Sequence, residues 1–332
     1  MSRQDVLRFL RTHAGTFLSG EELSRQLGLS RAAVWKAVDA LRREGYTIEA
    51  RTGLGYRLAG TPDVLTEAEI RGYLGKTEIV GNTLYCLDQV DSTNTYAKQL
   101  AMAGAPDGTV VVADSQTAGR GRMDRRFESP AGQGIYLTAL LRPGIPPQRL
   151  MPVTALAGVA VCQAVEEVCG VRPLLKWPND PVLHGRKLSG ILTELSLEAE
   201  TGRMQYLVVG IGLNVGQTAE DFPSDLQKVA TSLYQELGRN VSRPALAAAE
   251  IRALDRLYAA LRTGDLQAYL ETYRRDCVNL GRTVRIQGPS GEETAQAVGI
   301  DEEFGLVVED GTGERRTIRS GEVSVRGLYG YV

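Results

Sequence analysis

A lysine, an amide and a carboxylate are predicted to lie close together within residues 176–195. The Trp-Pro pair near the start favours an extended backbone, and Asn179 and Asp180 then favour a turn. A hairpin tip at residues 184–186 would return Lys187 to the side of that turn. A compact ammonium on a rigid element suits the binding of a carboxylate or a phosphate. Taken alone, Lys187 fits a solvated surface hairpin better.

A second stretch alternates glycine with arginine in the run Gly119-Arg120-Gly121-Arg122, just after a predicted strand. Glycines let the backbone approach a ligand, and guanidinium groups match the geometry of phosphates and carboxylates. We expect a loop that is mobile when empty and closes over an anion. It matches neither the P-loop nor the dinucleotide-binding fingerprint. A disordered basic loop and a nucleic-acid contact remain alternatives.

Two more stretches are candidates for ligand contact. Ser92-Thr93-Asn94 opens a predicted helix, where its hydroxyls can cap the helix or, with free amides, bind a small polar group. Tyr206–Asn214 reads as a strand interrupted by glycines, which often marks the close approach of a ligand or of another backbone.

Apolar periodicity places these stretches in a body of strands and helices. The predicted strands are Thr83–Leu87, Thr109–Ala113, Ile135–Leu141, Leu188–Leu197 and Tyr206–Asn214. The predicted helices start at Leu65 and after Ser92 and cover Leu150–Cys169, 225–237 and 242–277. This pattern predicts a mixed sheet with helices packed against it, an α+β or α/β body. The longest apolar run, 153–165, is too short to cross a bilayer and predicts a buried helix.

Residues 1–60 carry the signals of a winged helix-turn-helix. A helix is predicted at 3–11, Ser19 begins a capping box, and Gly28 and Ser30 end one helix and start the next. A Gly-rich turn at 52–55 predicts the wing. The residues expected to face DNA are Ser30, Arg31, Ala32, Trp35 and Lys36 on the second helix and Arg51 and Arg57 on the wing. A helical docking module without DNA is the alternative.

The last part of the chain reads as short strands separated by Gly-rich turns, which predicts a small SH3-like β-barrel. The predicted strands are Thr283–Ile286, Ala295–Ile300, Leu306–Glu309, Arg315–Ile318 and Glu322–Val325. The chain is therefore predicted to be an α+β multidomain protein. Its domains would be a winged helix-turn-helix at 1–60, a mixed-sheet body at 64–280 and the barrel at 281–332, with a linker at 59–63.

Composition limits the function classes. The 332 residues are 43% hydrophobic and 23% charged, with a formal net charge of −2, which predicts a soluble globular protein. Residues 1–60 hold ten Lys or Arg and six Asp or Glu, so only this head is expected to meet a polyanion. Four cysteines without a CxxC pair and no secretory pattern predict a cytoplasmic protein. Two histidines make a His-rich metal site or a Ser-His-Asp triad improbable.

Three motifs in order resemble the biotin–protein ligases: GRGR at 119–122, KWPND at 176–180 with the downstream Lys187, and GIGLN at 210–214. With the winged-helix head, the whole chain resembles the bifunctional biotin–protein ligase and biotin operon repressor family. The resemblance implies a class II-synthetase-like central domain that forms biotinyl-5′-adenylate from biotin and MgATP. The biotinyl group would then pass to a lysine of a biotin carrier domain, such as that of acetyl-CoA carboxylase.

The resemblance also implies roles for individual residues. Lys187 and Arg122 would be catalytic, meeting the biotin carboxylate and the α-phosphate. Contacts to biotin or the adenylate would come from Ser92, Thr93, Asn94, Gln116, Gly119, Arg120, Gly121, Arg122, Lys187 and Gly190. Contacts to the nucleotide would come from Lys176, Asn179 and Asn214, and Asp180 would hold Mg²⁺. Fixed positive charge offsets the repulsion between a carboxylate and a phosphate, and a closed loop excludes water.

As a repressor, the chain is expected to form a homodimer by edge-to-edge sheet pairing when the adenylate binds. Its two wings would then span operator half-sites at biotin biosynthesis genes. Two residues depart from the family loop: Asp124 stands where glycine is often found, and Phe127 where tryptophan is common. A lipoate or octanoate ligase of the same fold, a non-catalytic sensor and a ligase without DNA binding are the rival readings.

Overall fold

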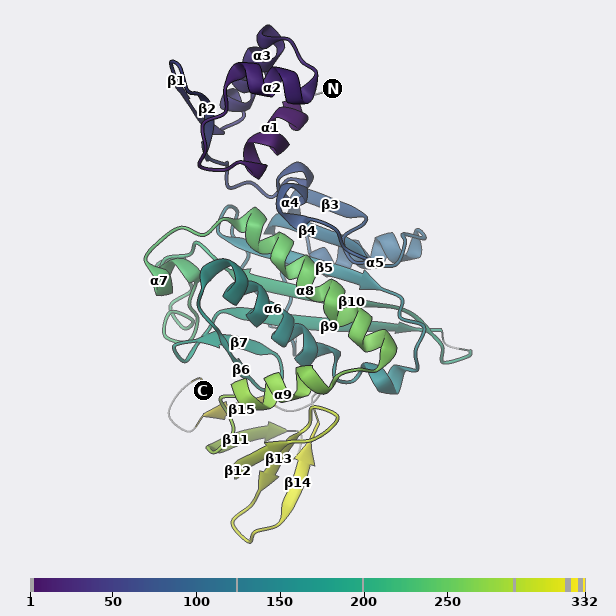
Figure 1. The fold of residues 1–332 in the computed structure, drawn as a ribbon. Coiled ribbons are helices and arrows are strands. Elements are labelled where there is room, and N and C mark those ends of the chain that lie inside the picture. Colours follow the sequence, from purple (N-terminus) through teal and green to yellow (C-terminus); the bar gives the residue numbers. More distant parts are fainter. Residues whose placement is uncertain are drawn as a thin grey trace. The chain divides into compact units, whose positions relative to one another are not determined.

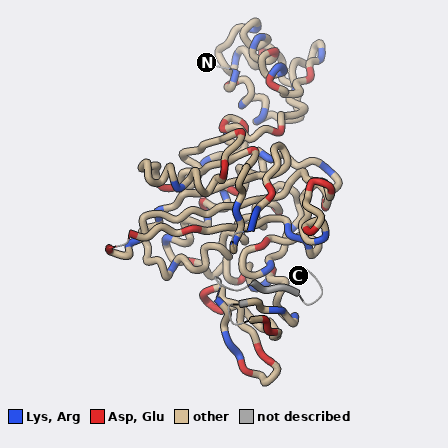
Figure 2. Tube along the Cα trace, turned by 180° about the vertical axis from the view of Figure 1, so that it is seen from behind, with Lys and Arg blue, Asp and Glu red and all other residues tan. Residues whose placement is uncertain are grey.

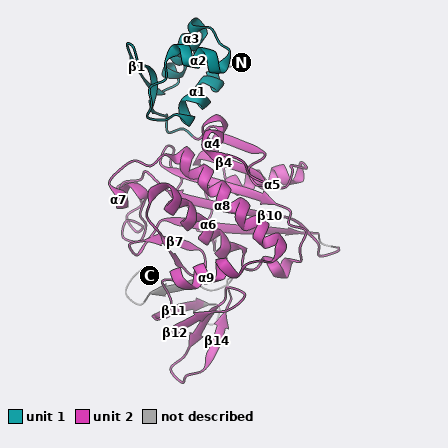
Figure 3. Ribbon diagram, in the orientation of Figure 1, with its two compact units in different colours: residues 1–64 teal, residues 65–332 magenta. Residues whose placement is uncertain are grey.

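The computed structural model describes residues 3–123, 125–198, 200–288, 291–319, 324–327 and 331. The chain folds into two compact units, residues 1–64 and 65–332 (Figure 3). The first unit ends at residue 64, one residue after the predicted linker at 59–63. The body and the tail belong to the same unit, so the predicted boundary between them stays a prediction.

The first unit is a three-helix module with a hairpin (Figure 1). Its elements are α1 (Arg3–Thr12), α2 (Gly20–Leu27), α3 (Arg31–Arg43), β1 (Thr47–Arg51) and β2 (Gly55–Gly60). The Ser19 hydroxyl accepts a hydrogen bond from Glu22 N and the Ser30 hydroxyl accepts one from Ala33 N, as the capping signals predict. Gly28 ends α2 in the left-handed conformation at φ 64°. Buried residues such as Leu10, Leu23 and Val38 form a core of this unit's own.

The second unit is built on a five-stranded sheet in the order β3-β4-β5-β10-β9. The strands are β3 (Leu84–Val90), β4 (Thr109–Gln116), β5 (Gly134–Leu141), β9 (Ser189–Leu197) and β10 (Met204–Asn214). The pair β3–β4 is parallel and the other pairs are antiparallel, which confirms the predicted mixed sheet.

Helices cover the two faces of this sheet unequally. On one face α6 (Val153–Cys169) packs against α8 (Arg243–Thr263), with α4 (Glu67–Leu74) beside α8 (Figure 1). Strand residues such as Val110 and Val209 point into this main core. Their neighbours Val111 and Val208 point the other way, where the short α5 (Thr93–Met102) is the one helix of the described chain that packs against them. The face beside α5 is therefore open for a site.

Two of the predicted helices are wrong in extent. Only α7 (Leu233–Leu237) forms within 225–237, because residues 229–231 exchange backbone hydrogen bonds with Lys187 and not with a helix. The predicted 242–277 helix breaks at Gly264, φ 83°, into α8 and α9 (Gln267–Asp276). Leu150 belongs to the short 3-10 helix Pro147–Leu150, and α6 begins at Val153.

The helical region Pro147–Cys169 is long and apolar enough to cross a membrane by length and composition. Length therefore does not exclude a span, contrary to the expectation from the shorter apolar run. Burial decides the matter, since 72% of its most apolar window lies inside the protein. It is the core helix of this unit.

The tail forms a five-stranded antiparallel sheet in the order β14-β13-β12-β11-β15. Its strands are β11 (Thr283–Gly288), β12 (Gly291–Ile300), β13 (Leu306–Glu309), β14 (Arg315–Ile318) and β15 (Ser324–Gly327). Residues 324 and 325 of the predicted last strand belong to β15, and its first two residues, 322 and 323, lie outside the described residues. Residues 289 and 290 of the predicted first turn also lie outside them.

Glu250 on α8 is a buried acid whose two carboxyl oxygens lack a hydrogen-bond partner within the described chain. Its side chain is 1% exposed, and burial raises the pKa of the carboxyl from 4.5 to about 8. The folded protein thus favours the neutral acid. The contribution of the neutral carboxyl to the free energy of unfolding is fully present below pH 4.5. It is lost as the pH rises toward 8, where the buried carboxyl must ionise.

We predict that Glu250→Gln raises the melting temperature at pH 9 by several degrees and leaves it nearly unchanged at pH 5, because glutamine cannot ionise. The measurement is thermal unfolding across this pH range. Glu314→Gln, at an exposed turn position, is the control and should shift the melting temperature at neither pH. An equal shift at both pH values for Glu250→Gln would contradict the ionisation argument.

Candidate functional site

The hairpin after the Trp-Pro pair brings Lys187 back to Asp180. Its strands are β6 (Leu174–Lys176), β7 (Asp180–Leu183) and β8 (Arg186–Lys187). His184 and Gly185 form the tip with φ 47° and 79°, the two positive angles of a tight hairpin turn. Lys187 Nζ lies 2.6 Å from Asp180 Oδ1. The predicted hairpin and its lysine–carboxylate contact are both confirmed.

Glycines on β9 and β10 make room for side chains from other elements. A Cβ on Gly210 would lie 2.0 Å from Asn94 Oδ1, and a Cβ on Gly212 would lie 2.4 Å from the Phe127 ring. On the neighbouring strand, a Cβ on Gly190 would lie 3.2 Å from the Lys187 side chain. Gly210 and Gly212 mark a close approach as predicted, but the approaching groups are side chains and not the ligand or backbone that was expected.

The Ser-Thr-Asn run at the start of α5 forms a buried polar network. Thr93 N donates to Gln116 Oε1 at 2.9 Å, and Thr138 Oγ1 donates to Asn94 Oδ1 at 2.7 Å. Asn94 Nδ2 donates to Glu194 Oε2 at 2.8 Å. Ser92 occupies the N-cap position, but its side chain makes no capping hydrogen bond, so the capping prediction is wrong for Ser92. The run is instead directed toward β4, β5 and β9.

The Gly-Arg loop folds back on itself over the sheet. Gly121 N donates to Arg125 O at 2.7 Å, and Phe127 N donates to Gly119 O at 3.0 Å. Arg122 Nη1 donates to Asn179 Oδ1 at 3.3 Å, and this hydrogen bond connects the GRGR loop directly to the KWPND turn. Burial lowers the pKa of the Arg122 guanidinium, and Asp180 opposes that shift. Asp124, the departure from the family loop, lies outside the described residues.

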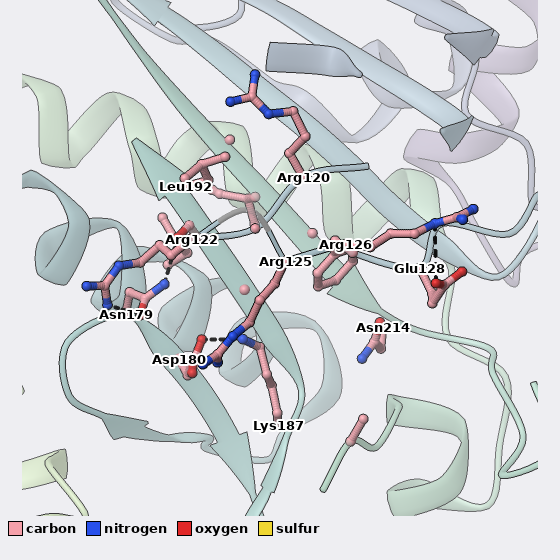
Figure 4. Close-up of a pocket in the computed structure, with 18 of the residues that line it drawn as sticks. Arg120, Arg122, Arg125, Arg126, Glu128, Asn179, Asp180, Lys187, Leu192 and Asn214 are labelled. Atoms are coloured by element: carbon pink, nitrogen blue, oxygen red, sulfur yellow. Dashed lines mark hydrogen bonds and ion pairs between the residues drawn. The ribbon is translucent and has the colours of Figure 1, made fainter. Parts of the chain in front are cut away.

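The loop's arginines take different directions (Figure 4). Arg125 points toward Asp180 and Lys187, and Arg126 reaches outward to Glu128. Arg120 points away from that cluster, with its Nη2 at 3.4 Å from Glu194 Oε1. Seen from behind, Lys and Arg residues gather over the middle of the central sheet (Figure 2). The loop and the hairpin together place positive charge on the sheet face that α6 and α8 leave uncovered.

These elements enclose a cavity of about 390 Å³. The predicted residues that line it are Ser92, Thr93, Asn94, Gln116, Arg120, Gly121, Arg122, Lys176, Asn179, Asp180, Lys187, Gly190 and Asn214. Gly119 is the predicted residue that stays outside the lining, because it packs against Phe127, Ser129 and Gln116. A volume of this size suits a small ligand with a polar end.

Asp180 is a poor candidate for a metal ligand. One carboxyl oxygen accepts from Lys187 Nζ and the other from the Tyr331 hydroxyl. Burial alone raises the pKa of this carboxyl, but the charges of Lys187 and Lys176 and these hydrogen bonds hold it below its ordinary value. The described residues contain no group of three His, Cys, Asp or Glu side chains that would hold a metal ion. The contacts argue against the predicted magnesium role, which no direct observation tests.

The head residues predicted to face DNA are at the surface of the first unit. Ser30, Arg31, Ala32 and Lys36 are exposed, and Trp35 is 57% exposed. On the wing, the guanidinium groups of Arg51 and Arg57 stack over the Phe17 ring at 5.1 and 4.7 Å from its centroid. Arg57 also pairs with Glu49 at 2.7 Å. An exposed tryptophan on a solvated helix suits contact with a partner.

Comparison with known proteins assigns the chain. The family models that match are the biotin/lipoate A/B protein ligase family over 86–214, an HTH domain over 2–57 and the biotin protein ligase C terminal domain over 280–326. The bifunctional ligase/repressor BirA of Bacillus subtilis is 40% identical over 314 residues, 95% of this chain and 96% of that protein. The chain belongs to the bifunctional ligase/repressor family. The family member of Escherichia coli is 31% identical over 94% of both chains.

A solved structure supports the family's fold for the central and tail regions. The biotin protein ligase from Aquifex aeolicus in complex with biotin and ATP has a TM-score of 0.64 and 30% identity. The match covers 74% of this chain and 99% of the Aquifex aeolicus chain. As a member of the family, this protein combines a winged helix-turn-helix, a ligase domain and a C-terminal sheet domain. It is an enzyme of the biotin–protein ligase class that also carries the N-terminal helix-turn-helix domain of the bifunctional ligase/repressors.

Several ligase-site residues escaped sequence analysis. Glu194 binds Asn94, Lys98 and Arg120, but its partners are about 70–100 positions away in the sequence, so no local pattern reveals them. Leu226 lines the cavity from the segment predicted to be helical, and Phe222 lines it from just before that segment. Tyr331 lines it from the end of the chain. The aromatic residue Phe127 was noticed only as a departure from tryptophan, yet its ring fills the space above Gly212.

We predict that Gly210→Ala lowers the free energy of unfolding by about 1–3 kcal/mol, because the new methyl group must displace Asn94 from a packed network. Denaturant unfolding measures this loss. Gly299→Ala, on β12, is the matched control, since its methyl group would meet Val307 at 3.8 Å, an ordinary contact. Equal free energies of unfolding for both variants would mean that Asn94 and its hydrogen-bond partners move to accommodate the methyl group at no cost, which would contradict the prediction.

Proposed function

We propose that this protein joins biotin to ATP as biotinyl-5′-adenylate, with release of pyrophosphate, and transfers the biotinyl group to a lysine of a carrier protein. A carboxylate oxygen of biotin attacks the α-phosphorus while the bond to the pyrophosphate oxygen breaks. The amine of the carrier lysine then attacks the acyl carbon, so that an amide forms, AMP leaves and a proton is released. The convergence of Lys187, Arg122 and Lys176 on one cavity carries this proposal.

The polar network at α5 would form the biotin end of the cavity. Thr93, Asn94 and Gln116 are held by mutual hydrogen bonds, so their remaining donors and acceptors have fixed directions. Gly210 and Gly212 lack side chains, so Asn94 and the Phe127 ring can lie directly against the sheet at this end of the cavity. A preorganised polar set above an apolar floor orients a small ligand at little entropic cost.

The cationic residues would form the reaction end. Lys187 would meet the biotin carboxylate and the charge that develops at the α-phosphate, and Arg122 would hold the adenylate beneath the loop. Preorganised positive charge in a water-poor site offsets the repulsion of two anions as they approach. Asn179 would be near the nucleotide, because Arg122 already donates to it from the loop.

Mg²⁺ would accompany the triphosphate. The residues of the described chain do not fit a metal site of their own, since Asp180 is engaged on both oxygens and no cluster of three metal ligands occurs there. Magnesium commonly binds through substrate phosphates and retained waters. No step of the proposed mechanism is assigned to a protein-bound ion.

The carrier would be the biotin carrier domain of a carboxylase. A relative in Mycobacterium tuberculosis, 33% identical over 71% of this chain, is a biotin–[acetyl-CoA-carboxylase] ligase. Four cysteines of the described chain are free thiols, which supports a cytoplasmic location, where ATP and such carriers occur.

The head would repress biotin biosynthesis genes with biotinyl-5′-adenylate as corepressor. Exposed Arg31, Trp35 and Lys36 support DNA contact by α3. Strand β9 is an edge of the central sheet with Leu195 and Leu197 exposed, which supports edge-to-edge pairing of two copies. The loop that would close on the adenylate contacts β9 through Arg120 and Glu194, so ligand binding would act on that edge.

The test of the enzymatic proposal is incubation of the protein with ATP and labelled biotin or labelled lipoate, each with a biotin carrier domain and a lipoyl domain. We expect label only from biotin and only on the biotin carrier. Lys187→Ala should reduce pyrophosphate release by about 100-fold or more, because a transition-state charge loses its counterion. Lys76→Ala, an exposed lysine remote from the cavity lining, should leave the rate unchanged. Transfer of lipoate alone, or full activity of Lys187→Ala, would end the proposal.

For the repressor role, footprinting on the promoter of a biotin gene should show protection that strengthens when biotin and ATP are both present. The affinity should fall steeply with salt, because phosphate contacts release counterions. Lys36→Ala should weaken protection, whereas Arg8→Ala, an exposed arginine on α1, should not. Protection that ignores both salt and ligand would contradict the corepressor mechanism.

A further inference from the structure

Tyr331, the residue before the last, reaches the ligase cavity from the end of the chain. It is half-buried and lines the cavity alongside Lys176, Asp180 and Lys187. Its hydroxyl donates to Asp180 Oδ2. The ammonium of Lys176 lies 3.9 Å from the centroid of its ring, within the range of a cation–π contact. One side chain of the tail thus contacts two charged residues of the KWPND motif.

Asp180 is the centre of this arrangement. Lys187 Nζ binds one of its oxygens and the Tyr331 hydroxyl binds the other. Lys176 lies opposite Asp180 in the register of the antiparallel strands β6 and β7. Asp180 is 9% exposed and Lys176 5%, so water is largely excluded from both and protein contacts fix their positions. Removal of the tyrosine hydroxyl would leave one carboxylate oxygen without its partner and would let Asp180 turn toward its lysines.

The tail is anchored beside the same turn. The indole Nε1 of Trp177 donates to Phe304 O at 3.0 Å. Its backbone N–H donates to Asn279 Oδ1 at 2.7 Å. The Tyr273 hydroxyl donates to Pro178 O at 3.1 Å, and its ring contacts Phe304 edge-on. These buried contacts hold the tail sheet to the KWPND turn independently of Tyr331. Tyr331 contacts the same motif separately, through Asp180 and Lys176.

We propose that Tyr331 is a positioning residue of the nucleotide end of the cavity: it holds Asp180 and Lys176 so that the ammonium groups of Lys176 and Lys187 face the phosphates of ATP. This inference rests on the proposed ligase function. The hydrogen bond and the cation–π contact of Tyr331 both go to the KWPND motif, which we place at the nucleotide end, whereas the α5 network would bind biotin. Its loss should thus affect ATP and spare biotin.

The experiment uses the full-length chain with Tyr331→Phe and Tyr331→Ala. Loss of the hydroxyl should raise the KM for ATP about three- to tenfold, which corresponds to the usual net contribution of one hydrogen bond, because the effect reaches ATP indirectly through Asp180. Loss of the ring as well should raise it about tenfold or more. The KM for biotin should stay within about twofold and the melting temperature should not fall, since the tail keeps its other anchors. Calorimetry with ATP alone and with biotin alone gives the same comparison without turnover.

Tyr234→Phe and Tyr234→Ala are the matched controls, because this tyrosine on α7 is 38% exposed and is absent from the cavity lining. A parallel rise of both KM values with a lower melting temperature would show general damage and overturn the proposal. A lower KM for ATP would show that Tyr331 blocks the site, and an unchanged KM would show that it does nothing there; either result overturns it. Wild-type activity with biotin tests the proposed function separately, since ATP calorimetry on the variants needs neither biotin nor a carrier.

Discussion

The ion pair between Lys187 and Asp180 is the interaction on which the ligase site depends. Three cationic groups, on Lys176, Lys187 and Arg122, converge on one partly buried cavity, where their mutual repulsion is weakly screened. Asp180 supplies the negative charge that makes this accumulation tolerable in the absence of ligand. When two anionic substrates enter, they bring enough negative charge to compete for the same cations. The cations of the site can therefore exchange their contact with the Asp180 carboxylate for contacts with the anionic groups of the substrates.

The scaffold around this pair is arranged so that each cation has a separate support. Lys187 is fixed by the β7–β8 hairpin and by backbone bonds with residues 229–231. Arg122 comes from the loop after β4 and is tied to Asn179. The two supports come from different segments of the chain, and Lys187 belongs to a sheet whereas Arg122 belongs to a loop. The unequal rigidity matches the roles proposed for them, a fixed charge and a closing one.

Local chemistry in the sequence was sufficient to predict much of this arrangement. The caps at Ser19 and Ser30 and the hairpin tip before Lys187 depend on neighbouring residues, and all three were predicted. The glycines of β10 were predicted to mark a close approach, but the side chains that approach them, Asn94 and Phe127, are distant in the sequence and were not predicted. The helix expected at 225–232 failed because its backbone pairs with Lys187, a partner far away in the chain. Glu194 and Tyr331 were missed for the same reason. Apolar periodicity reports which face is buried but carries no information about which distant side chain will meet it.

The ring of Phe127 occupies the hollow above Gly212, and the same short loop carries Arg122. Backbone hydrogen bonds from Gly121 N to Arg125 O and from Phe127 N to Gly119 O join the arginine end of this loop to its phenylalanine end. A movement that takes Arg122 away from Asn179 would therefore be coupled to a movement of the Phe127 ring away from Gly212. In the proposed ligase, the acyl end and the nucleotide end of the cavity would then open together, and the adenylate would meet water only at the moment of its release.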